Sequence, residues 1–492
     1  MRRPVHVLLS LALLGLTAGS VPAAQYDAVD LPDTPAGRNL AAFIETFNSG
    51  DSSRWRAFVI EQYSPEQGDS AAKVGGRFNL FEMVYNDIGP ITPFVIEESD
   101  DYRISVITQS AESGPFEFQN FTYQVDSLPP HKWDLMSVRP ADDPFEVLPE
   151  GDLSDERIAA WVDSVAGAMA GRGDYSGAVL LAKGGKPFYK RAFGEANKRY
   201  GVPNEIDTKF NLGSMNKMFT GVAVAQLAQQ GKLKFTDRII DHWPDYPDPA
   251  IGRKVTIHHL LTHTSGMTSY WQELFDTSFW EVRTVAGYFS LIKGKELAFE
   301  PGSEWQYSNS GPIVLGMLIE KITGMSYYDY VRENIYEPAG MVNSGCFEVD
   351  VPEPNLAIGY TQQDVFGNET NGWYANFFMH AVKGGPAGGG YSTVDDLLAF
   401  ANALRDHKLL NEAYTDTVIT GKSDMGPDMK YAYLFGDRNL DGHRIVGHNG
   451  GAPGISAELD IYWDDEYTVA VLSNYDGAAG HLNGKIRKLL TR

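Results

Sequence analysis

The periodicity of hydrophobic positions divides the chain into two parts. In the first part, two stretches with helical periodicity, Asn39–Asn48 and Ser52–Tyr63, precede segments between residues 94 and 135 in which hydrophobic and polar residues alternate. Helices followed by alternating strands predict a small α+β domain. The alternation changes parity at Asn120, and we interpret this change as a bulge or bend in a long strand.

In the second part, strand patterns enclose a long helical middle. A helix is predicted over Asp155–Ala170, further helical patterns run from residue 214 to about 408, and a closing helix fits His481–Leu490. Strands are predicted on both sides of that middle, at Gly177–Ala182, Pro187–Phe193, Arg444–Val446, Ser456–Trp463 and Thr468–Ser473. We therefore expect the early and late strands to pair in one sheet.

The N-terminus carries the pattern of a secretory signal peptide. Arg2 and Arg3 precede a nearly apolar run, Val7–Leu16, and small residues around Ala23 offer a cleavage point. The apolar run is shorter than the roughly 20 residues that span a bilayer, and an uncleaved anchor is the alternative. We expect an exported protein, periplasmic or secreted, without an integral membrane segment after cleavage.

A segment rich in proline and acidic residues, 140–152, indicates the boundary between the two parts. The predicted organisation is a signal peptide at 1–24, an accessory α+β domain at 30–146 and a second domain at 153–492.

Charge and cysteine content exclude several classes of function. The chain has 64 acidic and 41 basic residues and a formal net charge of −23, so it repels polyanions and is not expected to bind nucleic acid. The single cysteine, Cys346, excludes an intramolecular disulfide and any metal site built on a cysteine pair. We interpret Cys346 as a small core residue.

The first candidate for chemistry is Ser214-Met-Asn-Lys217. Residues at i and i+3 lie on one face of a helix, so the lysine amine can reach the serine oxygen. Serine is a weak nucleophile until a neighbour takes its proton, and lysine can do so only when burial or nearby cations lower its pKa. The same spacing occurs at Ser70–Lys73 and Ser290–Lys293, which we interpret as ordinary pairs, the Ser290 hydroxyl being packed.

Two further motifs follow along the chain. In Tyr307-Ser308-Asn309, a phenol beside a lysine ammonium can be partly ionised and pass a proton to a leaving group, and the asparagine can orient the lysine. A rival, Tyr374-Ala-Asn376, lies in an aromatic segment that we interpret as packing. The third motif, His448-Asn449-Gly450, precedes a predicted strand, where glycine lets a substrate lie against bare backbone. Rivals to this third motif are Lys183-Gly-Gly, in a predicted hairpin turn, and Lys383-Gly-Gly, in a glycine-rich loop.

In this order the three motifs resemble those of the penicillin-recognising serine hydrolases of the class C β-lactamase type, a family of β-lactamases, D-alanyl-D-alanine carboxypeptidases, D-aminopeptidases and esterases. Segments Leu260–Met267 and Gly388–Thr393 resemble the same family, and the resemblance covers residues 153–492. It implies an α+β fold, with an antiparallel sheet flanked by helices and a helix-rich subdomain. The first domain, with Phe47-Asn-Ser-Gly-Asp51, resembles the SnoaL-like cone fold.

The resemblance implies roles for the motif residues. Ser214 is the expected acylated nucleophile, Lys217 its base or proton partner, and Tyr307 the base for one or both half-reactions. Asn309 is expected to hold the lysine and the substrate amide. Whether Lys217 or Tyr307 is the general base stays open. No cofactor or metal is expected.

The third motif is expected to bind substrate through His448, Gly450 and Gly451, and the backbone N–H groups of Ser214 and Gly451 are expected to form an oxyanion hole. His448 replaces the lysine of β-lactamases. A neutral imidazole attracts a substrate carboxylate weakly, which disfavours efficient β-lactam hydrolysis and favours peptidase, amidase or esterase activity.

Metal binding is the less favoured interpretation of two other patterns. His259 and His263 have metal-pair spacing without the glutamate of a zinc protease, and we interpret His263 as satisfying backbone in a turn. The segment Asp437–Gly442 matches the opening of a calcium loop, but the position of the closing glutamate is His448, so we predict a polar hairpin turn.

The sequence thus predicts an exported serine hydrolase that forms an acyl-enzyme with an amide or ester of a small molecule or peptide. A non-hydrolysing penicillin-binding or cell-wall sensor on the same fold is the alternative, and a hydrolase with a metal at His259 and His263 is a third hypothesis. The substrate, the role of the first domain and the oligomeric state are left open.

Overall fold

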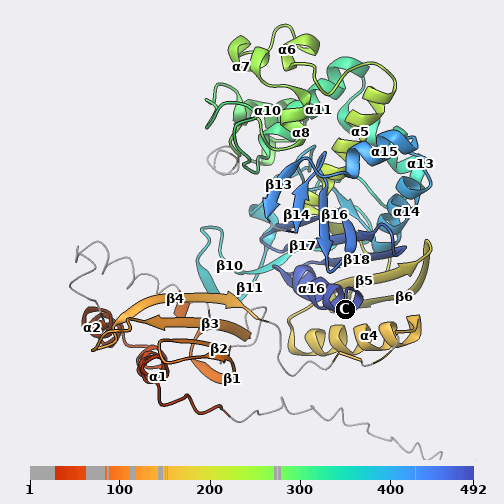
Figure 1. The fold of residues 1–492 in the computed structure, drawn as a ribbon. Helices are drawn as coiled ribbons and strands as arrows, with labels where there is room; N and C mark the ends of the chain where they lie inside the picture. The colour runs from red at the N-terminus through yellow and green to blue at the C-terminus, as the bar shows by residue number, and fades with distance from the viewer. Residues whose placement is uncertain are drawn as a thin grey trace, which may run out of the picture. The chain divides into compact units, whose positions relative to one another are not determined.

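The structure is a computed structural model that describes residues 28–62, 84–85, 88–110, 118–141, 148–149, 151, 153–270, 274, 279–426 and 428–492 (Figure 1). The chain forms two compact units, Met1–Glu146 and Val147–Arg492, and each is described here by itself. The predicted signal peptide, the Ser70–Lys73 pair and most of the predicted boundary lie outside the described residues. The domain limits and the cone-like assignment stay predictions.

The first unit packs helices against a four-stranded antiparallel sheet in the order β1-β2-β3-β4. Phe43, on one of its helices, packs against Phe121 and Tyr123 of the sheet. The described elements are α1 (Pro35–Asn48), α2 (Ser52–Gln62), β1 (Ile91–Ser99), β2 (Arg103–Ser110), β3 (Phe118–Val125) and β4 (Trp133–Pro140).

The expected bulge at Asn120 is wrong. The pairing of β3 with both neighbouring strands runs through Asn120 without a register shift. The parity changes because Phe118 and Phe121 point to opposite faces of the strand, and both side chains are buried; the register shift in the pairing of β3 with β4 lies between Gln124 and Val125.

The second unit is built on an eight-stranded sheet in the order β13-β14-β15-β16-β17-β18-β5-β6. All of its neighbouring strands run antiparallel, and the early strand β5 pairs with the late strand β18, as the sequence predicts. The strands are β5 (Gly177–Lys183), β6 (Lys186–Phe193), β13 (Ser423–Gly426), β14 (Met429–Tyr431), β15 (Gly436–Leu440), β16 (His443–Ala452), β17 (Ile455–Tyr462) and β18 (Tyr467–Ser473).

Helices cover both faces of this sheet (Figure 1). Helices α4 (Asp155–Arg172) and α16 (Ala478–Leu490) pack on one face, while α5 (Lys217–Gln229) and α14 (Val394–Arg405) pack on the other. Residues of β17 therefore alternate between two cores and are all buried, Leu459 on the α5 side and Tyr462 on the α16 side. The α+β fold with a flanked antiparallel sheet is confirmed.

The helices of the middle segment lie around α5 and beyond it (Figure 1). Its longer helices are α10 (Val285–Ile292), α11 (Ser310–Thr323) and α15 (Glu412–Ile419), and its short ones are η2 (Gly213–Asn216), α6 (Ile239–His242), α7 (Pro249–Lys254), α8 (Ile257–Leu261), η3 (Phe279–Glu281), α12 (Tyr327–Val331), η4 (Arg332–Tyr336), α13 (Glu337–Ala339) and η5 (Asn376–Phe378). Short strand pairs accompany them: β7 (Glu195–Asn197) with β8 (Val202–Pro203), β9 (Phe210–Asn211) with β12 (Tyr391–Ser392), and β10 (Tyr360–Gln363) with β11 (Glu369–Ala375). In the described part of the chain, no helix has the length and hydrophobicity needed to cross a bilayer.

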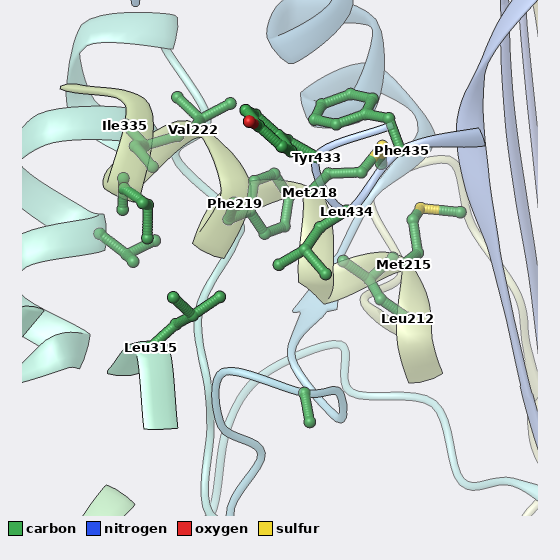
Figure 2. Packing of buried hydrophobic residues seen from close by; sticks show 14 of the residues in the cluster. Leu212, Met215, Met218, Phe219, Val222, Leu315, Ile335, Tyr433, Leu434 and Phe435 are labelled. Atoms are coloured by element: carbon green, nitrogen blue, oxygen red, sulfur yellow. The ribbon is translucent and has the colours of Figure 1, made fainter. Parts of the chain in front are cut away.

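Helix α5 is the core of the second unit. Nearly every side chain of this helix is buried, and Phe219 and Val222 pack among Leu315, Ile335 and Leu434 (Figure 2). Lys217, the first residue of the helix, is therefore held at the edge of a well-packed hydrophobic core.

Candidate active site

Ser214 lies in a tight turn that the last long hairpin approaches closely. The turn is η2, Gly213 within it has a positive φ of 49°, and β16 passes against it. A methyl group at Gly450 would overlap the Leu212 carbonyl oxygen and would lie 2.8 Å from the Ser214 nitrogen. One at Gly213 would lie 3.0 Å from the Gly451 nitrogen. Glycine at these positions thus brings the backbone amides of Ser214 and Gly451 onto facing segments.

Lys217 makes three side-chain hydrogen bonds around this turn. Its Nζ lies 3.0 Å from Ser214 Oγ, 2.7 Å from Asn309 Oδ1 and 2.5 Å from the Ala387 carbonyl oxygen. The first partner is a hydroxyl, which can donate or accept, and the other two can only accept. The Lys217 amine therefore has two partners that can only accept a hydrogen bond and one, the Ser214 hydroxyl, that can either donate or accept.

Lys217 is fully buried and lacks a counter-ion. Its side chain has 0% exposure, and no carboxylate among the described residues forms an ion pair with it. Burial lowers the pKa of Lys217 well below its ordinary value of 10.5, because a low-dielectric environment penalises the ammonium. A neutral amine at neutral pH can take a proton from Ser214.

Tyr307 and Asn309 reach the site from the segment before α11. The Lys217 Nζ lies 4.9 Å from the centre of the Tyr307 ring, and Asn309 Nδ2 donates to Ser269 Oγ at 3.0 Å. Burial raises the pKa of Tyr307 to about 12, although a hydrogen bond with Ser214 acts in the opposite direction and lowers the pKa. The effect of burial thus outweighs that of the polar neighbours, and it favours the protonated phenol over the partly ionised one that the sequence allows.

The predicted residues line a cavity of about 210 Å³. Ser214, Tyr307, Asn309 and Gly451 all line it, whereas Lys217 lies beneath Ser214. Its other walls include aromatic and aliphatic side chains and a glycine-rich loop: Tyr270, Leu274, Tyr288, Ile455, Gly388 and Gly389. Gly450 is buried behind this wall and acts through the close packing of β16 rather than by lining the cavity.

His448 lines a second cavity, of about 380 Å³, that shares the Tyr307 wall with the first. Its Nε2 lies 3.0 Å from the Tyr431 hydroxyl and its Nδ1 lies 2.5 Å from the Asn449 carbonyl oxygen. Burial lowers the pKa of His448 to about 4. Both ring nitrogens are therefore occupied by protein groups, and the imidazole is neutral.

His263 is a site residue whose contacts the sequence did not predict. It is buried with a positive φ of 59°, its ring centre lies 4.5 Å from that of Tyr307, and its Nε2 lies 2.9 Å from the Tyr431 hydroxyl. The Ser308 amide donates to its Nδ1 at 3.4 Å, so the expectation that His263 satisfies backbone is confirmed. The only sequence signal for this environment was the Leu260–Met267 segment, and no signal indicated Ser269 or Tyr431.

The rival motifs lie elsewhere. Ser290 is exposed and donates to the Gly287 carbonyl oxygen at 2.6 Å, so the expectation that it is packed is wrong; it lies on the outer face of α10. Tyr374 is 47% exposed, so this part of the aromatic segment is not core packing either. Gly184 and Gly185 form the turn between β5 and β6, as predicted, and Lys383 pairs with Glu348 at 3.2 Å.

The candidate metal ligands have other partners. His259 Nδ1 accepts a hydrogen bond from the Thr256 amide at the start of α8. Asp437 pairs with Arg444 at 2.9 Å, in the hairpin of β15 and β16 whose turn is Asp441-Gly442, as predicted. No group of three or more metal-ligating side chains occurs among the described residues. Burial raises the pKa of the Cys346 thiol to about 12, which fits a packed residue rather than a nucleophile.

Comparison with known proteins places this geometry in a family. A family model described as Beta-lactamase matches residues 162–491. Penicillin-binding protein 4* of Bacillus subtilis (strain 168) is 30% identical over 316 residues, which cover 61% of this chain and 68% of that protein.

Comparison with solved structures supports the same family. The crystal structure of a penicillin binding protein from Bacillus halodurans is 31% identical, with a TM-score of 0.60, over 67% of this chain and 98% of that chain. A D-stereospecific amidohydrolase from Streptomyces sp., 24% identical with a TM-score of 0.55 over 66% of this chain and 97% of its own, shares the fold. The chain therefore belongs to the beta-lactamase family and is a serine hydrolase.

Proposed function

We propose that this hydrolase cleaves an amide or ester through an acyl-enzyme on Ser214, with Lys217 as the general base. The observation that carries the proposal is the contact of 3.0 Å between Lys217 Nζ and Ser214 Oγ at a fully buried amine. Membership of the family leads us to expect a serine nucleophile, and Ser214 is a serine whose Oγ contacts a buried lysine amine.

The direction of the hydrogen bonds supports Lys217 as the base. Asn309 Oδ1 and the Ala387 carbonyl oxygen each accept one N–H of the amine. In the neutral amine the remaining lone pair then faces Ser214, whose hydroxyl proton it can take as Oγ attacks the substrate carbonyl. For this reason we propose Lys217, rather than Tyr307, as the general base.

Tyr307 is better suited to deliver the proton than to remove it. A phenol whose pKa is raised to about 12 keeps its proton at neutral pH. After Lys217 has taken the serine proton, Tyr307 can pass a proton to the leaving amine or alkoxide and be reprotonated from the lysine ammonium. Water then attacks the acyl-enzyme, with Lys217 again accepting a proton, and Ser214 is regenerated.

The facing amides of Ser214 and Gly451 are the proposed oxyanion hole. Fixed N–H donors stabilise the charge that develops on the carbonyl oxygen, and the loss of one such donor typically reduces kcat by about 10²–10³. No step of this scheme requires a metal or cofactor.

The proposed substrates are peptides, D-amino-acid amides or esters, and β-lactams are proposed as further acylating compounds. The aromatic and aliphatic walls around Ser214 suit an acyl group with apolar surface. The names of the related proteins, penicillin-binding proteins and a D-stereospecific amidohydrolase, are compatible with this range. A non-hydrolysing penicillin-binding sensor is the second candidate, because two of these relatives are named penicillin-binding proteins.

Active-site labelling tests the proposal. A fluorophosphonate probe should label the wild type and Ser290→Ala, whose serine has the same spacing to a lysine, but not Ser214→Ala. Labelling of Ser214→Ala would contradict it. Turnover of p-nitrophenyl esters, D-amino-acid anilides and nitrocefin then separates hydrolase from sensor, since a sensor forms a long-lived adduct without turnover.

We further propose that the protein is exported, on the strength of the signal-peptide pattern at residues 1–24. Expression of the full chain in a bacterial host should yield a mature protein that begins near Ala24 or Gln25 outside the cytoplasm. An intact N-terminus in the cytoplasmic fraction would contradict this.

A further inference from the structure

Three side chains form a hydrogen-bonded series between two backbone groups beside the active site. The Ser308 amide contacts His263 Nδ1 at 3.4 Å, His263 Nε2 contacts the Tyr431 hydroxyl at 2.9 Å, and that hydroxyl contacts His448 Nε2 at 3.0 Å. The series ends at the Asn449 carbonyl oxygen, 2.5 Å from His448 Nδ1. It joins the segment that carries Tyr307 to the strand that carries Gly451.

The two ends of the series fix its direction. A backbone amide can only donate and a carbonyl oxygen can only accept. His263 must therefore accept at Nδ1 and donate from Nε2 to Tyr431, Tyr431 must donate to His448 Nε2, and His448 must donate from Nδ1. Each imidazole then carries one proton, each ring nitrogen has one partner, and the Tyr431 hydroxyl both accepts from His263 and donates to His448.

Protonation of His448 would break this order. A second N–H, on Nε2, would face the Tyr431 oxygen, which already accepts from His263, and the Tyr431 O–H would lose its acceptor. Tyr431 is only 2% exposed, and a buried donor that loses its acceptor costs free energy. The arrangement therefore favours neutral His448, in the same direction as burial, which lowers its pKa to about 4.

Other charges around His448 do not reverse this preference. Lys217, on α5, lowers the pKa of His448 further if it is charged. In the cavity that His448 lines, Arg487 pairs at 2.5 Å with each of Glu458 and Asp460, and Arg438 contacts Met429 Sδ at 3.6 Å. Two formal negative and two formal positive charges thus face this cavity together.

We propose that Tyr431 is a positioning residue that fixes His448 in one neutral tautomer. Strand β16 then offers no cation to a substrate carboxylate, and the enzyme selects substrates whose group next to His448 is uncharged. The proposal rests on the proposed function and narrows its substrate class toward neutral esters and amides. It predicts that removal of one hydroxyl, outside the reacting groups, raises the pKa of His448.

The first test needs no hydrolysis. In Ser214→Ala protein, ¹⁵N spectra of His448, assigned with His448→Gln, should give the tautomer protonated on Nδ1 with no titration between pH 8 and 5. The Tyr431→Phe change should move the apparent pKa of His448 from about 4 toward the ordinary 6.5. Titration near 6.5 already in the parent protein, or no change on Tyr431→Phe, would overturn the proposal even if Ser214 is the nucleophile.

Tyr433→Phe is the matched control. Tyr433 lies two positions along the chain, and its hydroxyl contacts a different imidazole, His258 Nδ1, at 2.9 Å. Its loss should leave the His448 spectrum unchanged. If the apparent pKa of His448 shifts as much in the control as in Tyr431→Phe, the cause is a general change in packing rather than loss of the Tyr431 hydroxyl, and the assignment is overturned.

The second test measures selectivity. For p-nitrophenyl butyrate and the p-nitrophenyl monoester of succinate, the ratio of kcat/KM in the wild type should favour the butyrate and stay flat from pH 8 to 5.5. In Tyr431→Phe the succinate ester should gain about tenfold as pH falls, because a protonated imidazole attracts the carboxylate. His448→Lys should give a similar gain at all these pH values. A wild-type preference for the succinate ester would mean that another cation, such as Arg438, binds its carboxylate. This result would overturn the proposal.

Discussion

Lys217 Nζ lies 3.0 Å from Ser214 Oγ, and the lysine side chain is buried without a carboxylate in ion-pair contact among the described residues. This relationship links the fold to the proposed chemistry. The serine turn presents the hydroxyl to the cavity, while the first residue of α5 places an amine beneath it at the edge of the core. The predictions below follow from this pair and from the packing that holds it.

Lys217→Arg should abolish most of the activity. Guanidinium stays protonated at every working pH and cannot take the serine proton, so we expect kcat/KM to fall by about 10²–10⁴. Ester hydrolysis by the purified variant measures this. Lys293→Arg, at the exposed rival pair, should stay within twofold of the wild type, and an equal loss in both variants would point away from a base at position 217.

The buried amine should also leave a pH signature in stability. Because burial lowers the pKa of folded Lys217 below its unfolded value of 10.5, the unfolded chain binds more protons between those two pKa values. Stability contributed by this group therefore rises with pH through that window. Urea unfolding should give a smaller rise in the free energy of unfolding with pH for Lys217→Met than for the wild type. Identical slopes would mean that Lys217 titrates normally in the folded protein.

Gly450→Ala should disrupt the site through packing. The added methyl group would overlap the Leu212 carbonyl oxygen beside Ser214, so backbone must move. We expect a stability loss of about 1–3 kcal/mol and a larger relative loss of kcat than of substrate binding. Gly484→Ala on α16, where a methyl group meets nothing within 4 Å, is the control and should be neutral or stabilising. Equal effects of the two substitutions would refute the packing argument.

Arg487→Met should be strongly destabilising. Arg487 is the shared partner of Glu458 and Asp460 on β17, and its loss leaves two buried carboxylates without their ion pair. Such a change typically costs about 3–5 kcal/mol. Thermal and urea unfolding measure the loss, which should be smaller in the triple variant Glu458→Gln, Asp460→Asn, Arg487→Met. A triple variant as unstable as the single one would show that packing, not charge, dominates.

Local pattern predicted much of the fold. The strand patterns at Gly177–Ala182 and Thr468–Ser473 indicated the strands that pair as β5 and β18, although 284 residues separate Lys183 from its partner Tyr467. Periodicity failed at Asn120, because alternation cannot distinguish a bulge from a strand with hydrophobic residues on both faces.

The site was predictable where chemistry depends on local spacing. Ser214 and Lys217 are three residues apart, so helix geometry alone brings them together. The environments of Tyr307 and His448 were not predictable in this way. The ionisation of Tyr307 and the lowered pKa of His448 both depend first on burial, and the hydrogen-bond partner of His448 Nε2, Tyr431, was not indicated by any sequence signal.

The most direct test of the central claim is the pH dependence of Ser214 phosphonylation, followed by intact mass and peptide mapping. The account predicts one adduct, on the peptide that contains Ser214, and a rate constant that rises with pH and levels off at an apparent pKa well below 10.5. A modified residue elsewhere, or a rate that keeps rising to pH 10.5, would contradict a serine activated by a buried, neutral lysine.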